Sequence, residues 1–203
     1  MPNRPPNAVL GFRPHTYWTS AVALAGPRHA PRVIERRRIP FAAGEERSAF
    51  HRAEQTDLES ARALIEGVRV ATEANAAREI GQFIADLQRD SVTIRTAVVP
   101  EVINKLPDNL EDILKMHARM LAATGNFYRG VVASACGVLG LQVHRAVERE
   151  LTVLVGDRLD ETAAVVEARL KAMGRALGPP WTEDYQLATL AAWLHLDDTD
   201  EDD

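Results

Sequence analysis

The sequence contains little of several residues on which common folds and sites depend. Among its 203 residues there is one cysteine, Cys136, which excludes an internal disulfide and every zinc site built from several cysteines. Aromatic residues make up only 5% of the chain, and no apolar run approaches the roughly 18 residues that a membrane-spanning helix requires. The first residues are polar and proline-rich, unlike a signal peptide. These absences predict a cytoplasmic protein without a membrane partner.

Charge is distributed unevenly along the chain. The formal charge is -5 at pH 7, but six of the last seven residues are acidic, so the rest of the chain carries +1. With 46% hydrophobic and 26% charged residues, we predict one globular domain over residues 1–196 and a disordered acidic tail over residues 197–203. Residues 1–52 carry nine arginines against three glutamates, a balance that suits contact with phosphate groups.

Short apolar and β-branched runs between turn residues predict five strands. The first three form an antiparallel meander with turns at Pro14-His15 and Gly26-Pro27. A fourth strand ends at Pro100, and the fifth follows Gly140. The predicted strands cover residues 8–12, 20–25, 32–41, 91–99 and 141–147.

Apolar residues spaced by three and four positions predict four helices. They cover residues 57–87, 109–139, 160–177 and 182–196, and Thr182 is the expected N-cap of the last one. The order of elements is three strands, helix, strand, helix, strand and two helices. The predicted fold class is therefore α/β, with a mixed five-stranded sheet and helices on both faces.

This order resembles the ribonuclease H-like fold, and three short motifs resemble those of RuvC-type Holliday-junction resolvases. The segment from Gly11 to His15 stands where that family opens with Gly-Ile-Asp-Pro-Gly, and Glu101 stands where its second acid ends the fourth strand. Residues 184–191 are similar to the family's Asp-x-x-Asp-Ala-Leu-Ala pattern. Glu101 and Asp184 match two of the four acidic positions implied by the resemblance, whereas Arg13 and Leu187 replace the other two. Glu183 is a neighbouring carboxylate that a shifted register brings into the site.

The resemblance implies a nuclease site with two divalent cations about 4 Å apart, bridged by the first-strand aspartate. Arg13 reverses the charge at that position. A guanidinium about 4 Å from a divalent ion is repelled by roughly 8 kcal/mol at an effective dielectric near 20. We therefore predict no bound metal and no other cofactor, and we predict that Arg13 makes charge-assisted hydrogen bonds to Glu101 and Asp184 instead.

Four further residues are candidates for contact with nucleic acid. Arg32, Arg36 and Arg38 form a modest phosphate-binding stripe, because alternate residues of a strand share a face. His15 lies in the turn that faces the predicted cleft. The alternative interpretation of the arginines is a solvated strand edge protected against aggregation, and that of His15 is an exposed turn histidine.

Other candidate residues also have purely structural interpretations. Acids in a first helical turn, such as Glu183 and Asp184, are favoured by the helix dipole alone, and Glu101 could be an exposed loop charge. His117 and Cys136 fall on the apolar stripe of the second helix, which predicts a buried or interfacial histidine and an unreactive thiol.

The leading functional hypothesis is a RuvC-like protein that has lost two-metal cleavage and binds DNA, RNA or a protein partner, as a homodimer like the resolvases that it resembles. The alternative is a structure-selective endonuclease that uses Mg²⁺ or Mn²⁺ at a rearranged site of Glu101, Glu183 and Asp184. A third hypothesis is a purely structural scaffold for protein interactions. Salt-dependent DNA binding and divalent-metal binding distinguish these possibilities.

Overall fold

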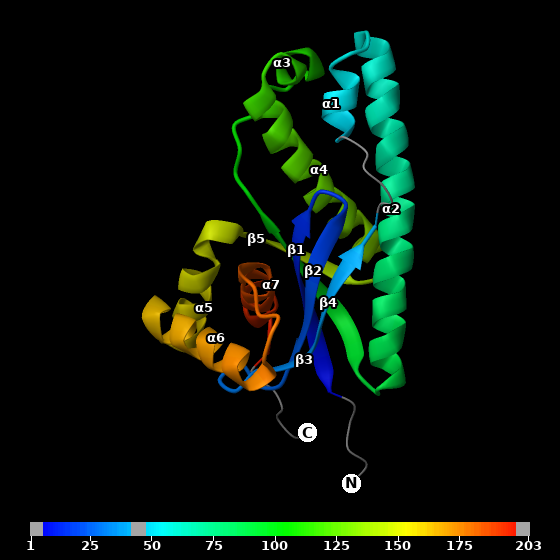
Figure 1. Cartoon of the computed structure of the whole chain (residues 1–203). Helices are drawn as coiled ribbons and strands as arrows, with labels where there is room; N and C mark the ends of the chain where they lie inside the picture. Colours follow the sequence, from blue (N-terminus) through cyan, green and yellow to red (C-terminus); the bar gives the residue numbers. More distant parts are fainter. Residues whose placement is uncertain (1–5, 42–47, 198–203) are drawn as a thin grey trace.

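The computed structural model describes residues 6–41 and 48–197. Its centre is a five-stranded mixed sheet in the order β3-β2-β1-β4-β5 (Figure 1). The strands are β1 (Asn7–His15), β2 (Trp18–Ala25), β3 (Arg32–Pro40), β4 (Thr93–Glu101) and β5 (Gln142–Val147). The first three strands are antiparallel, whereas β1, β4 and β5 run parallel, so the carboxyl ends of these three strands meet at one edge of the sheet. The predicted α/β class and mixed five-stranded sheet are confirmed.

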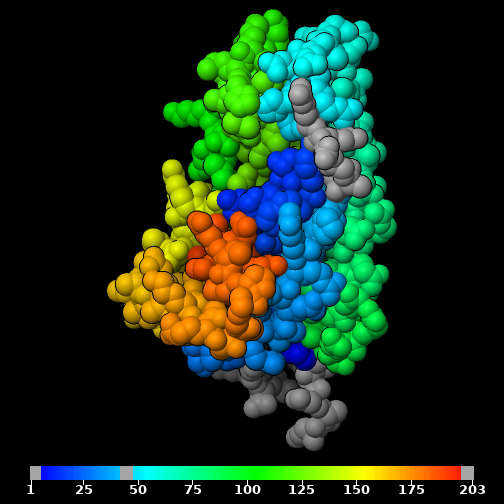
Figure 2. Space-filling model, in the orientation of Figure 1, coloured from blue at the N-terminus to red at the C-terminus, as the bar shows by residue number. Residues whose placement is uncertain are grey.

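Helices cover both faces of this sheet. One face packs against α2 (Leu58–Arg89) and α4 (His117–Val138), and the other against α7 (Glu183–Trp193), behind which lie α5 (Leu151–Leu159) and α6 (Ala163–Leu177) (Figure 1). Figure 2 shows α6 and α7 beside the strands of the meander, with α2 along the opposite side. The shorter helices are α1 (Ala49–Ala53), α3 (Leu110–Leu114) and the 3-10 turn η1 (Glu148–Glu150).

The central strand β1 is buried on both faces, as expected for a strand between two layers of helices. Leu10 and Phe12 are fully buried in the core shared with α2 and α4, whereas Val9 joins the core on the α7 side. Gly11 also faces α7, where an added Cβ would lie only 1.8 Å from the carbonyl oxygen of Ala188. The absence of a side chain at Gly11 therefore allows α7 to lie directly on the strand that carries Arg13.

A smaller apolar cluster lies where α1 and α3 meet α2 and α4, at the end of the molecule beyond the carboxyl ends of the parallel strands (Figure 1). Phe50 of α1 packs there with Met120 and Ala123 of α4. The 32 residues of α2 span about 48 Å at 1.5 Å per residue. The amino-terminal half of α2 therefore packs in this cluster, through Ile65, while the half from Ala76 to Leu87 packs against the sheet.

The first turn lies two residues later than predicted. β1 continues through Pro14 to His15, and Thr16-Tyr17 connects it to β2. Proline is tolerated at this point because the pairing of β1 with β4 ends at Gly11, so beyond it one side of β1 makes no ladder hydrogen bonds. Arg13 and His15 therefore both lie in the strand, on the same face as Gly11.

The single helix predicted over residues 109–139 is wrong, because the chain is extended at Met116, which separates α3 from α4. His117 is exposed at the first position of α4 rather than buried, and the side chain of Leu121 is 54% exposed. Helix α5 was not predicted at all. The other three predicted helices and all five strands are present, with ends shifted by a few residues.

Two further expectations concern Cys136 and the chain as a whole. Cys136 is fully buried among core residues, and burial raises the pKa of its thiol to about 12.

No helix within residues 6–41 and 48–197 is both long and apolar enough to cross a membrane. Of the predicted acidic tail, residues 198–203 lie outside the described residues.

Candidate functional site

The carboxyl ends of β1, β4 and β5 bring together residues that are far apart in the sequence. Arg13 lies near the end of β1, Glu101 ends β4, and Glu148 follows β5 directly. In open α/β sheets, this edge is where ligands most often bind. We therefore take it as the candidate functional site.

The centre of the site is a carboxylate held between two arginines. Arg13 Nη2 lies 3.2 Å from Glu148 Oε1, and Arg129 Nη2 lies 3.3 Å from Glu148 Oε2. The three side chains are only 20%, 17% and 10% exposed for Arg13, Glu148 and Arg129. The prediction that Arg13 contacts Glu101 and Asp184 is wrong, because Arg13 pairs instead with Glu148, which follows β5, two strands away in the sheet.

Asp184 instead binds His15. The carboxylate oxygen Oδ1 lies 2.7 Å from His15 Nε2, which joins the end of β1 to the first turn of α7. The imidazole stacks on the ring of Trp18 at a centroid distance of 4.1 Å, and the guanidinium of Arg38 lies 4.1 Å from the Trp18 ring. His15, Trp18, Arg38 and Asp184 thus form one connected cluster beside Arg13.

Glu101 and Glu183 share a pocket of about 320 Å³ with Glu148. Two of the three acids proposed for a rearranged metal site are therefore near each other, but Asp184 is bound to His15. Within residues 6–41 and 48–197, no group of three or more carboxylate, histidine or cysteine side chains has the geometry to hold a metal ion. Because Glu148 already has two guanidinium partners, the residues at this edge do not fit a two-metal centre.

The arginines of β3 differ in their availability. Arg36 donates a hydrogen bond of 2.9 Å to the carbonyl of Gly178 and packs over Trp181, so its position is fixed by the segment before α7. Arg32 and Arg38 are exposed, but they lie at opposite ends of β3. The predicted stripe of three arginines is thus reduced at this edge of the sheet to Arg38.

Three residues of this edge were not predicted from the sequence: Glu148, Arg129 and Arg145. The signal for Glu148 was present, since Glu148 directly follows β5, Glu101 ends the adjacent parallel strand β4, and both strand ends must meet at one edge. No comparable signal marks Arg129, which reaches the site from the middle of α4.

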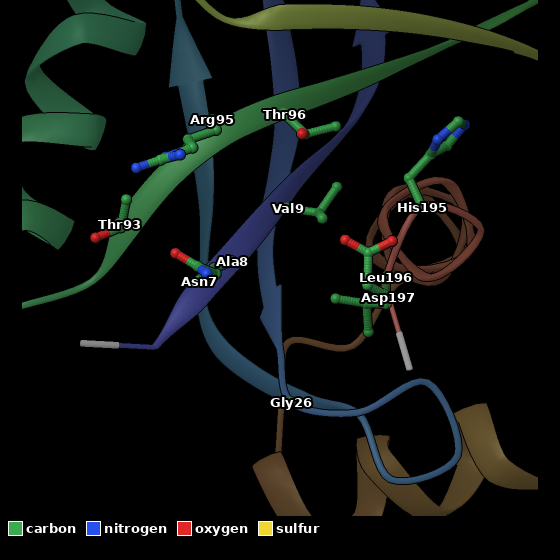
Figure 3. Close-up of a pocket in the computed structure, with 10 residues that line it drawn as sticks. All are labelled: Asn7, Ala8, Val9, Gly26, Thr93, Arg95, Thr96, His195, Leu196 and Asp197. Carbon is green, nitrogen blue, oxygen red and sulfur yellow. The ribbon is translucent and has the colours of Figure 1, made fainter. Parts of the chain in front are cut away.

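A second polar pocket, of about 270 Å³, lies at the opposite edge of the sheet, where β1 and β4 begin (Figure 3). Asn7 and Thr93 contribute from the strands, and His195 and Asp197 from the segment after α7. Arg95 points away from His195 in this pocket (Figure 3). Its polar groups do not converge on one point, so we do not take it as the functional site.

The arrangement of the sheet and its helices identifies the fold. A mixed sheet with three antiparallel strands, two parallel additions and helices on both faces is the ribonuclease H-like fold, in the form found in RuvC-type resolvases. In this chain, the edge of the sheet holds an arginine-glutamate-arginine network.

Two solved structures are similar to this chain in fold. The chain is similar to Thermus thermophilus RuvC in complex with a Holliday junction substrate, with 13% sequence identity, a TM-score of 0.53 and coverage of 93% of this chain and 91% of that one. A second structure of Thermus thermophilus RuvC has 14% identity and a TM-score of 0.51, and the match covers 93% of this chain and 92% of that chain. No protein-family model matches the sequence. No curated protein matches it either.

Proposed function

We propose that this chain binds nucleic acid at the carboxyl-terminal edge of its sheet and does not cleave it by the two-metal route. The observation that carries the proposal is the guanidinium of Arg13, bound to Glu148 at the strand position where the resemblance implies a metal-bridging aspartate. The similarity in fold to a RuvC that was solved with a Holliday junction supports nucleic acid as the ligand.

The register of the sheet supports a path for a nucleic-acid strand. Arg13 lies opposite Ser20 and Ser20 opposite Arg38, so the two arginines lie about 10 Å apart on one face, two strand spacings from each other. Trp18 lies beside Arg38 in an open groove, which the turn between β1 and β2 and the end of β3 form together. His15 and Arg38 cover the two faces of the Trp18 ring, so this groove offers a nucleic-acid strand cations for its phosphates rather than a free ring for its bases.

Fluorescence anisotropy tests this proposal directly. With labelled four-way junction, single-stranded and double-stranded DNA in low salt and EDTA, we expect binding that weakens steeply as salt increases, because phosphate contacts release counterions. Arg38→Gln should weaken binding. It should also reduce the slope of the logarithm of the binding constant against the logarithm of salt concentration by about one. The absence of binding to all three DNAs at low ionic strength would overturn the proposal and favour a scaffold that binds protein. Light scattering on the same samples measures whether the chain forms the expected homodimer.

The second candidate is a divalent-metal-dependent endonuclease, favoured by the pocket that Glu101, Glu148 and Glu183 share. We expect no junction cleavage with Mg²⁺ or Mn²⁺ and no increase in melting temperature on addition of Mn²⁺. Arg13→Asp, which restores an acid on the first strand, should introduce a Mn²⁺-dependent increase. Cleavage by the unaltered chain that is lost in Glu101→Ala would show that the second candidate is correct.

A further inference from the structure

A basic pocket lies at the same sheet edge, between α4 and the end of β5. It has a volume of about 240 Å³ and is lined by Glu101, Val102, Asn126, Arg129 and Arg145. Arg145 belongs to the edge strand β5, and Arg129 is the partner of Glu148 described above. Neither arginine belongs to the motifs that resemble the resolvases.

The two arginines of this pocket have unused hydrogen-bond donors. The side chain of Arg129 is only 10% exposed, and its buried Nε has no hydrogen-bond partner among the described residues. Within the same part of the chain, Arg145 makes no ion pair or hydrogen bond. Arg145 is exposed as a residue, but partial desolvation of its guanidinium lowers its pKa; Glu101 partly opposes this effect, and Arg129 lowers the pKa further. Two neighbouring cations with free donors are stabilised by an added anion.

The charges that line the pocket indicate the charge of that anion. Of the charged residues that line the pocket itself, Arg129 and Arg145 face one carboxylate, that of Glu101, which leaves a net charge of +1. A phosphodiester group carries one negative charge, and its two free oxygens match the paired donors of guanidinium. Asn126 accepts a hydrogen bond from Asn104 through Oδ1, so its amide N–H groups remain as neutral donors.

We propose that this pocket takes one phosphodiester group of a nucleic-acid backbone, bound directly by Arg129 and Arg145 without a divalent cation. The proposal rests on the nucleic-acid binding proposed above and assigns it a site. It differs from a nuclease centre in a testable way. Glu101 opposes binding at a pocket that is formed by arginines, whereas it would support binding at a centre that is formed by metal ions.

The experiment compares two arginines on adjacent parallel strands. Arg145→Gln removes a cation that lines the pocket, and Arg95→Gln removes an exposed cation of β4 near the other end of the sheet. With labelled single-stranded DNA in EDTA, we expect Arg145→Gln to weaken binding about tenfold and to lower the salt dependence by about one ion. Arg95→Gln should change the affinity less than twofold. Neither residue is buried, so both variants should fold.

A third variant separates a guanidinium site from a metal site. Glu101→Gln should tighten binding several-fold in EDTA, because it removes the negative charge that faces the phosphodiester. Strands with and without a 5′-phosphate should bind equally, since an internal phosphodiester occupies the pocket.

The possible failures are distinguishable. If DNA binds but Arg145→Gln and Arg95→Gln behave alike, the pocket assignment is overturned and the proposed function stands. A requirement for Mg²⁺, weaker binding by Glu101→Gln, or dependence on the 5′-phosphate would each overturn the assignment as well. If the unaltered chain binds no DNA at low salt, both proposals fail.

Discussion

At the scale of single residues, the carboxyl-terminal edge of the sheet is organised around Glu148. Its carboxylate is 17% exposed and has one guanidinium on each oxygen. A mostly buried charge that loses a partner is costly, because the remaining group is desolvated without compensation. We expect Arg13→Met, which keeps an apolar stem of similar length, to lower the free energy of unfolding by about 1–3 kcal/mol in urea denaturation.

A double-mutant cycle shows whether this loss belongs to the pair. Glu148→Gln alone should also destabilise the protein, and the double variant should lose less than the sum of the two single variants. Arg149→Met is the matched control, since Arg149 is exposed and its change should stay within about 0.5 kcal/mol. Additive effects in the cycle would contradict a direct contact between Arg13 and Glu148.

Arg13 could be placed at the strand-end site from the sequence, but its partner could not. Several carboxylates were available near the predicted sheet edge, and a guanidinium binds the one that the backbone places nearest. That choice depends on distances of a few ångströms between strand ends, which a residue pattern does not contain. The pairing of Asp184 with His15 was missed for a related reason, because the first turn was placed at His15 rather than after it.

At the scale of elements, the contact between β1 and α7 depends on Gly11. A Cβ there would overlap the carbonyl oxygen of Ala188, and neither backbone can move without disturbing the buried residues around it. We expect Gly11→Ala to lower the free energy of unfolding by about 3 kcal/mol or more, or to prevent folding. Urea denaturation of the purified variant measures the effect.

The control for this substitution is Gly67→Ala. Gly67 is exposed in α2, and an added Cβ there would meet nothing within 4 Å. Alanine is favoured over glycine inside a helix, so this variant should be more stable by about 0.5–1 kcal/mol. If both alanines had the same effect, the close packing of α7 on β1 would be refuted.

The main elements were predictable because their residue patterns are long and regular. The break at Met116 was not, because the apolar residues of α3 and α4 continue one spacing across it. The chain changes direction there so that Leu110 and Ile113 of α3 pack on the cluster around Phe50. That requirement comes from α1 and α2, which are distant in sequence, and no glycine or proline marks the break.

At the scale of the whole molecule, His195 links stability to pH. Burial lowers the pKa of its imidazole to about 4, and the stacked His144 and nearby Arg158 act in the same direction. The unfolded chain, with a pKa near 6.5, therefore binds a proton that the folded chain does not bind between about pH 6.5 and 4. The free energy of unfolding should decrease as the pH falls through this window, by at most about 3 kcal/mol from this group.

The contribution of His195 to the pH dependence of stability is measured by comparing variants with the unaltered chain. His195→Phe keeps a ring against His144 but cannot titrate, so its urea stability should decrease less than that of the unaltered chain between pH 6.5 and 4. His29→Phe changes an exposed histidine and should leave the pH dependence unchanged. Parallel pH profiles for the two variants would contradict the role of His195.

The length of α2 has a mechanical consequence for the molecule. One end of this uninterrupted helix packs against the sheet, and the other end packs in the small cluster with α1, α3 and α4. We expect a displacement of the cluster of α1, α3 and α4 to tilt α2 against the face of the sheet opposite α7. One continuous helix, with no loop, thus joins the part of the protein most distant from the sheet to the core that β1 and β4 share.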